Sequence, residues 1–150
     1  MLFRMKSWSV CMVLCLAPLS AAAKAPPGRY QVNEAAKTVY DTMTKLTWQR
    51  DGTASGTKAW AAAGTYCSTL VTDGAGWRLP TIVELRSIVD LSQMTPAIDP
   101  TAFPSTPTDT WTWSSTKVQG LSSSAWYVFF SDGLSSSNVI TYSNRVRCVR

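Results

Sequence analysis

The run at residues 76–85, Gly-Trp-Arg-Leu-Pro-Thr-Ile-Val-Glu-Leu, constrains the fold more than any other part of the chain. An aromatic residue, an arginine and a proline lead directly to a predicted helix start. Thr81 can cap this helix, and Glu84, three residues later, can reach back to complete a capping box. Apolar residues then recur at helical spacing, which predicts a helix over residues 81–91 with one buried face. The run contains no nucleophile–base pair and no set of metal ligands, so it predicts structure rather than a reaction.

Residues 1–25 have the layout of a secretory signal peptide. Two basic residues precede an apolar stretch at residues 7–19, and small residues follow, with cleavage expected after Ala23 or Ala25. The apolar stretch, about 13 residues, is too short to span a bilayer comfortably. A buried N-terminal strand or helix is the alternative. We therefore expect export to the periplasm, the cell surface or the medium. The expected organisation is a signal peptide at 1–25, a leader at 26–37 and one domain at 38–150.

Removal of the signal peptide changes the charge of the chain. The full sequence has 14 basic and 9 acidic residues, a net charge of +5. Arg4, Lys6 and Lys24 leave with the signal, so 11 basic residues remain against 9 acidic ones, a net charge of +2. A nucleic-acid partner thereby loses its compositional support, and no later apolar run is long enough for a membrane span.

The sequence contains no histidine. This absence excludes Ser-His-Asp and Cys-His catalysis, histidine general bases and most zinc sites. The nine acidic residues lie mainly at turns and helix starts, and no pair of them has a recognisable glycosidase context. We therefore expect a protein that is not an enzyme and that uses no cofactor and no metal.

Cys67 and Cys148 are the two cysteines that remain after the signal peptide. An even pair in an exported chain predicts one disulfide, which would close a loop of about 80 residues. Two free thiols are the alternative.

Short strands, two helices and turn-rich segments follow one another along the domain, as in an α+β fold. Residues 38–50 have the pattern of a hairpin, and residues 58–70 have the apolar spacing of a helix. Four prolines punctuate residues 92–110, which we expect to be a loop. Asp132-Gly133 is a strong turn signal. Further strands are expected at 110–115, 125–131, 139–142 and 145–150.

Six ordered blocks of this domain resemble the DUF1566 family, also described as the C-terminal domain of a Legionella collagen-like adhesin. Together they cover about residues 38–150, and their number and order make the likeness specific. The blocks are residues 39–41 with 44–50; Trp60 with Ala63, Tyr66, Cys67 and Leu70; residues 77–81 with Glu84 and Leu85; residues 98–100 with Phe103 and Pro104; residues 113–116 with 125–133; and residues 146–150.

The resemblance implies a C-type lectin-like fold, related to that of formylglycine-generating enzymes. In this fold two helices pack on a small, mainly antiparallel twisted sheet, and the N- and C-terminal strands are adjacent. A helix cysteine bonds to a cysteine of the last strand, here Cys67 and Cys148. The adhesin of the family is associated with binding of sulfated glycosaminoglycans. The chain departs from the family pattern at Lys45, where glycine is usual, and lacks the Glu-Pro-Asn and Trp-Asn-Asp motifs of calcium-dependent lectins.

Aromatic residues of the strand region are the first candidates for a ligand-binding surface. Tyr127 and Phe129 alternate with Trp126 and Phe130, so one set is exposed if the other is core. Trp126 matches a framework position of the family and is expected in the core, as are three other tryptophans. Two exposed aromatics on a sheet face form a binding platform; the alternative is that the 92–110 loop covers them. The framework tryptophans are Trp48, Trp60, Trp77 and Trp126, whereas Trp111 lies outside the best-matched blocks.

Polar residues near the turns are the second set of candidates. Serine-rich tips at 122–124 and 135–137 flank the strands, and Ser, Asn and Tyr are adaptable contact residues. Plain solvated turns are the alternative. The candidates in this set are Asp132, Asn138, Tyr142 and Asn144.

Arginines near the C-terminus are the third set. Arg145, Arg147 and Arg150 can receive a sulfate or carboxylate bidentately. The alternative is a solvated edge strand, or ion pairs with acidic neighbours such as Asp41 or Asp51.

These residues favour an exported, non-enzymatic module that binds an anionic glycan or a cell-surface protein through the strand and loop region at 110–145. An envelope domain with a structural or assembly role is the alternative, and an enzyme of the formylglycine-generating type is a third hypothesis. We expect no nucleic-acid partner. The sequence leaves the oligomeric state open.

Overall fold

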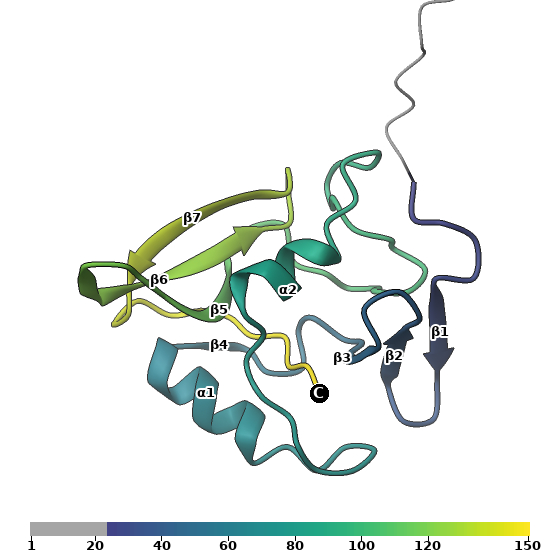
Figure 1. Cartoon of the computed structure of the whole chain (residues 1–150), viewed down its shortest axis with the longest axis horizontal. Coiled ribbons are helices and arrows are strands. Elements are labelled where there is room, and N and C mark those ends of the chain that lie inside the picture. Colours follow the sequence, from purple (N-terminus) through teal and green to yellow (C-terminus); the bar gives the residue numbers. More distant parts are fainter. Residues whose placement is uncertain (1–23) are drawn as a thin grey trace, which may run out of the picture.

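Two helices and two sheets form the α+β fold that the sequence predicts (Figure 1). The computed structural model describes residues 24–150, so the predicted signal peptide lies outside the described residues except for its last two positions. No helix in this part is long and apolar enough to cross a membrane. In chain order the elements are β1 (Tyr30–Asn33), β2 (Thr38–Asp41), β3 (Leu46–Gln49), β4 (Thr57–Lys58), α1 (Trp60–Ser68), α2 (Ile82–Ser87), β5 (Thr112–Val118), β6 (Leu121–Phe129), β7 (Leu134–Val139) and β8 (Asn144–Arg145).

The strands form two separate sheets, whereas the sequence predicts one. The smaller sheet has the order β1-β2-β3 and the larger one β4-β8-β5-β6-β7. All pairs are antiparallel except β5 with β8. Figure 1 shows the smaller sheet at one end of the molecule and the β5–β7 strands at the other. Strand β1 lies within the predicted leader and pairs with β2 along its whole length, so this segment is part of the folded unit.

The hydrophobic core consists of two clusters on opposite faces of the larger sheet. On one face, Val128 and Phe130 pack with residues of α2, the smaller sheet and the 92–110 loop. On the other face, Trp113 and Ala125 pack with α1 and the disulfide. Successive residues of β6 therefore point into different clusters, as the alternation of a strand requires.

The C-terminal segment ties these parts together. The predicted disulfide is confirmed: Cys67 of α1 is bonded to Cys148, 81 positions later in the chain. The neighbouring Val149 forms bridges with Trp48 of β3 and with Arg78. The third strand of the fold thus lies beside the C-terminus.

The capping box of the second helix is also confirmed, but α2 is shorter than predicted. The Thr81 side chain accepts from the backbone N–H of Glu84, and the Glu84 carboxylate accepts from the backbone N–H of Thr81. The helix ends near Ile88, because the backbone of Asp90 turns away to donate its N–H to the Ala97 carbonyl.

The serine-rich segments are strands rather than turns, which corrects the sequence-based prediction. Residues 122–124 belong to β6, and residues 135–137 belong to β7, which pairs with β6 without a break in register. Of the strand predicted at 139–142, only Val139 lies in a strand, as the last residue of β7, and residues 140–142 form a turn. Serine has a low strand propensity, but pairing with a neighbour overrides such preferences.

Candidate functional site

An aromatic stack lies on one face of the larger sheet. Trp111 stacks on Tyr127 with ring centroids 4.8 Å apart and an angle of 20° between the planes. Tyr127 also packs against the cluster around Trp113 below it. Trp111 keeps 36% of its surface exposed, so the stack is supported from the protein side and accessible from solvent.

The strand register places further residues on the face of this stack. Phe129 lies two positions after Tyr127 on β6, and residues at this spacing share a face. In β7, Leu134 pairs with Phe129 and Ser136 with Tyr127, and directly paired residues point to the same side of a sheet. We call this surface the Trp111 face. Its members are Trp111, Tyr127, Phe129, Leu134, Ser136 and Asn138.

The 92–110 loop packs on the opposite face of β6. Ile98, Ala102 and Phe103 are buried in the cluster that contains Val128 and Phe130, and Ala97 donates its backbone N–H to the Phe130 carbonyl. Tyr127 belongs to the other cluster. The stack of Trp111 on Tyr127 is therefore not buried beneath this loop's apolar residues.

Arg145 lies on the strand beside Trp111. Its backbone N–H donates to the Trp111 carbonyl at 2.8 Å, and in β8 it pairs with Thr112 of β5. Its side chain is half-buried, and its Nε has no hydrogen-bond partner. The four ion pairs of residues 24–150 all involve other arginines, so no carboxylate within 4 Å balances the Arg145 charge in the described structure.

Arg147 lies inside the protein, so the expectation of an exposed side chain is wrong. It keeps 1% of its surface exposed and donates to the backbone carbonyls of Gln49 and Arg50 and to the Thr106 hydroxyl. Burial lowers the pKa of the guanidinium to about 10, against the opposing effect of Asp51, so it remains charged at neutral pH. Its donors are used within the fold and do not reach a ligand.

Asn144 is likewise buried, with 2% of its surface exposed and no partner for its Nδ2. Asp132 accepts the backbone N–H of Leu134 and so holds the β6–β7 turn. Asn138 accepts the neighbouring Val139 N–H at its Oδ1, and its pairing with Ala125 places it on the Trp111 face. Tyr142 is exposed in the turn before β8.

Of the nine predicted ligand-binding residues, the structure thus brings Trp111, Tyr127, Phe129 and Asn138 to one face, with Arg145 on the adjoining strand. Sequence reasoning missed Leu134 and Ser136, because their segment has the composition of a loop. The register with β6 is the signal that places them, and it is not visible in the sequence.

The chemistry available at the Trp111 face is that of binding. Flat aromatic surface, amide groups and hydroxyl groups share this face, and Arg145 lies on the adjoining strand. No group of three His, Cys, Asp or Glu side chains within residues 24–150 is arranged to hold a metal ion. Arg150, the third predicted arginine, forms an ion pair with Asp73 and lies over the Trp77 ring.

Comparison with known families gives a match over nearly the whole described structure. The model of the Lcl C-terminal domain matches residues 37–150, which include both sheets except β1, both helices and the disulfide. No curated protein and no solved structure matches the chain. The match covers more than half of the sequence, and the chain therefore belongs to the Lcl C-terminal domain family.

Proposed function

We propose that this protein is an exported, non-enzymatic binding module that recognises an anionic glycan through the Trp111 face. The observation that carries the proposal is the partly exposed stack of Trp111 on Tyr127. It is supported by Arg145 on the adjoining strand, which forms no ion pair with a carboxylate within the described residues. An aromatic face offers a flat apolar surface to a sugar ring. A guanidinium binds sulfate or carboxylate oxygens with two parallel hydrogen bonds. Membership in a family that includes an adhesin domain supports the same class of function.

The C-type lectin-like character of the fold is part of this proposal. Its support is the bond between Cys67 of α1 and Cys148 near the C-terminus, and the bridge between Trp48 and Val149, which sets β3 beside the end of the chain. Recognition without calcium is proposed, since the sequence lacks the lectin motifs for that ion.

Binding of size-defined heparin fragments by the mature protein tests the proposal. We expect Trp111→Ala to weaken binding roughly fivefold to tenfold and Arg145→Gln by a similar factor, because each removes one of the two kinds of contact. Matched controls are Met94→Ala and Arg86→Gln: Met94 is an exposed apolar residue, and Arg86 is an exposed arginine of α2 without an ion pair.

The control variants are expected to bind as the parent protein does. Equal losses for Arg86→Gln and Arg145→Gln would show a nonspecific charge effect rather than a site. Absence of binding to heparin at low salt would overturn the anionic-glycan proposal. Arg147 is left unchanged in these tests because its substitution disturbs the fold.

An assembly role is the second candidate, and the free edge of β7 favours it. This strand is the last of the larger sheet, and its sequence Leu-Ser-Ser-Ser-Asn-Val has none of the charges or prolines that usually protect an edge. Size measurement in solution distinguishes the two functions. If the parent protein is an oligomer and Ser137→Lys dissociates it, the assembly role is favoured. If the parent protein is a monomer, the glycan-binding role is favoured.

The non-enzymatic part of the proposal has its own test. A formylglycine-generating type of enzyme requires reactive cysteines, and both Cys67 and Cys148 are bonded to each other. We expect thiol titration of the unfolded mature protein to find no free thiol. Two reactive thiols in the native protein would revive the enzymatic hypothesis.

A further inference from the structure

An open groove of about 480 Å³ lies beside α1, and none of its lining residues belongs to the Trp111 face. Its walls are mainly apolar and come from three parts of the chain that are distant in sequence. A volume of this size is typical of sites for small molecules. The lining residues are Trp60, Ala61 and Gly64 of α1, Arg78, Leu79 and Thr81 of the segment before α2, and Ser115 of β5.

Gly64 gives the groove its depth. Glycine is unfavourable in a helix interior compared with alanine, and Gly64 lies in the middle of α1. Its φ is not positive, and a Cβ built on it meets no atom within 4 Å. Neither the backbone conformation nor the packing of neighbours requires a glycine here. What the missing side chain provides is open space against the helix backbone.

Trp60 forms a rigid wall next to this space. Trp60 and Gly64 are four positions apart, so they are neighbours on the helix surface. The Trp60 Nε1 donates to the Ser114 carbonyl at 2.8 Å, which fixes the indole and uses its polar group. The remaining accessible part of the side chain is the aromatic ring, whose partner in the groove is therefore apolar.

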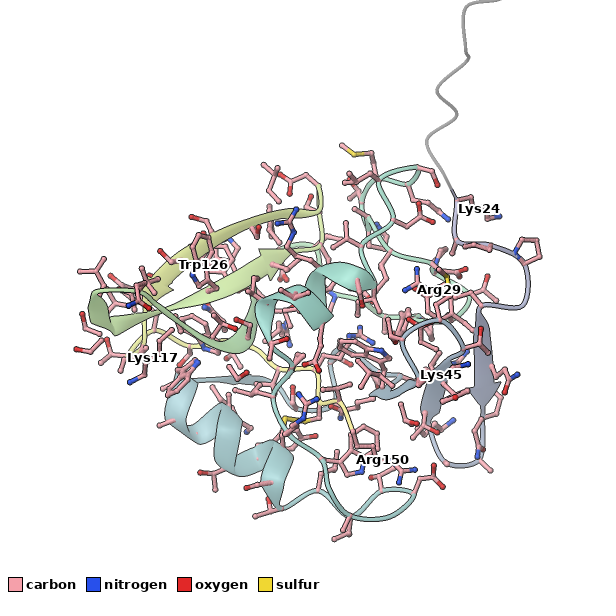
Figure 2. All side chains as sticks on the ribbon, viewed as in Figure 1. Lys24, Arg29, Lys45, Lys117, Trp126 and Arg150 are labelled. Carbon is pink, nitrogen blue, oxygen red and sulfur yellow. A yellow bond between two sulfur atoms is a disulfide. The ribbon has the colours of Figure 1, made fainter. Side chains whose placement is uncertain are left out.

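The charge at this site is positive. Lys117 Nζ lies 5.0 Å from the centroid of the Trp60 ring, and Figure 2 shows Lys117 close to the start of α1. Lys117 is not among the lining residues, whereas Arg78 is, and the Arg78 guanidinium forms two hydrogen bonds with the Glu84 carboxylate at 2.7 and 2.8 Å. Since no ion pair of the described structure includes Lys117, the net charge next to Trp60 comes from this lysine.

We propose that the groove binds a small molecule with a flat, mainly apolar ring and one anionic group. The ring lies over Gly64 against Trp60 and Leu79, and the anion faces Lys117. This site is separate from the Trp111 face in its residues and in its preference for an apolar ring. The proposal does not depend on the glycan-binding function.

Calorimetric titration of the mature protein with 1-naphthoate tests the proposal, with 1-naphthalenemethanol as the neutral analogue. We expect Gly64→Leu to weaken binding of both compounds at least tenfold, because the new side chain occupies the space above the helix. Ala62→Leu is the matched control, since Ala62 is an exposed residue of α1 that does not line the groove. It is expected to leave both affinities unchanged.

Lys117→Gln tests the charge separately. We expect it to weaken binding of 1-naphthoate about fivefold and to leave the neutral analogue unaffected. Unchanged binding in Gly64→Leu would overturn the proposal, as would equal effects of Lys117→Gln on both compounds. Glucuronate bound as well as 1-naphthoate would also overturn it, because that result requires a polar site. Heparin binding by Gly64→Leu is expected to be normal, which keeps this test independent of the Trp111 face.

Discussion

The C-terminal segment and the β6–β7 hairpin differ in a way that their sequences do not suggest. Residues 146–149 are all buried although they form no regular strand, whereas β7 is a regular strand with four of its six residues exposed. The C-terminal segment is covered on both sides, by β3 and Arg78 and by the disulfide to α1. Strand β7 is paired on one side only, with β6.

The two regions therefore differ in how much the stability of the fold depends on their side chains. Every polar group of the C-terminal segment that is buried needs a partner in the fold, so substitutions there are costly. In β7, by contrast, four of the six residues are exposed, so substitutions there are expected to cost little. The following predictions measure this contrast, and each gives an outcome that would break it.

Arg147→Ala is expected to have the largest effect, a loss of about 5 kcal/mol in the free energy of unfolding. The substitution removes the donor of three acceptors, two of them buried and one part-buried, and an unsatisfied buried acceptor costs roughly 1–3 kcal/mol. It also removes a guanidinium that lies 4.9 Å from the centroid of the Phe103 ring. Urea unfolding followed by tryptophan fluorescence measures the change.

Arg145→Ala is the matched control for that measurement. Arg145 is two positions away on the same segment, but its side chain has no hydrogen-bond partner in the described structure, so we expect a loss below about 1 kcal/mol. Similar losses of stability for the two variants would contradict the distinction between Arg147, whose side chain supports the fold, and Arg145, whose side chain does not.

Replacement of both Cys67 and Cys148 by alanine is expected to cost about 4 kcal/mol. The bond closes a loop with a sequence separation of 81, and the chain-entropy estimate rises with loop length. The same urea experiment, under conditions that keep the parent protein oxidised, measures the effect. A loss below about 1 kcal/mol would mean that the C-terminal segment is held by its backbone bridges and Arg147 alone.

Glu84→Gln is expected to cost about 1 kcal/mol at pH 7. The hydrogen bonds from Arg78, together with the backbone N–H of Thr81, lower the pKa of the Glu84 carboxyl to about 2 from its ordinary value of 4.5. A carboxyl with a lowered pKa contributes fully above the unfolded value and loses its contribution as the pH falls through the folded value.

The difference in stability between the parent protein and Glu84→Gln is therefore expected to be constant from pH 7 to about 5, and to shrink between about 4.5 and 2. Unfolding measured along this pH series checks the expectation. If the difference in stability between the parent protein and Glu84→Gln does not change with pH, the substitution affects only the capping geometry. The ion pair between Glu84 and Arg78 then contributes nothing to stability.

The sequence predicts two kinds of feature in this structure. In one kind the interacting residues lie close together in the chain, and in the other only one pairing of residues is possible. The capping box needs only Thr81 and Glu84, and two cysteines allow one intramolecular disulfide. The role of Arg147 depends on carbonyl groups almost 100 positions earlier. The strand character of β7 depends on β6, since serine alone favours a turn. Alternation also fails for residues 146–149, because it applies only where one face of a strand is exposed.

The smallest expected effect is that of Leu134→Ala in β7, a change within about 0.5 kcal/mol. Leu134 is 67% exposed, so its truncation removes little buried area and leaves no cavity. Val146→Ala is the matched truncation in the C-terminal segment and is expected to cost about 2 kcal/mol, since Val146 is fully buried. Measuring both by urea unfolding at two protein concentrations tests whether the hairpin is free. A loss above about 1.5 kcal/mol for Leu134→Ala that grows with protein concentration would show that a second copy covers the Trp111 face, because only association makes stability depend on concentration.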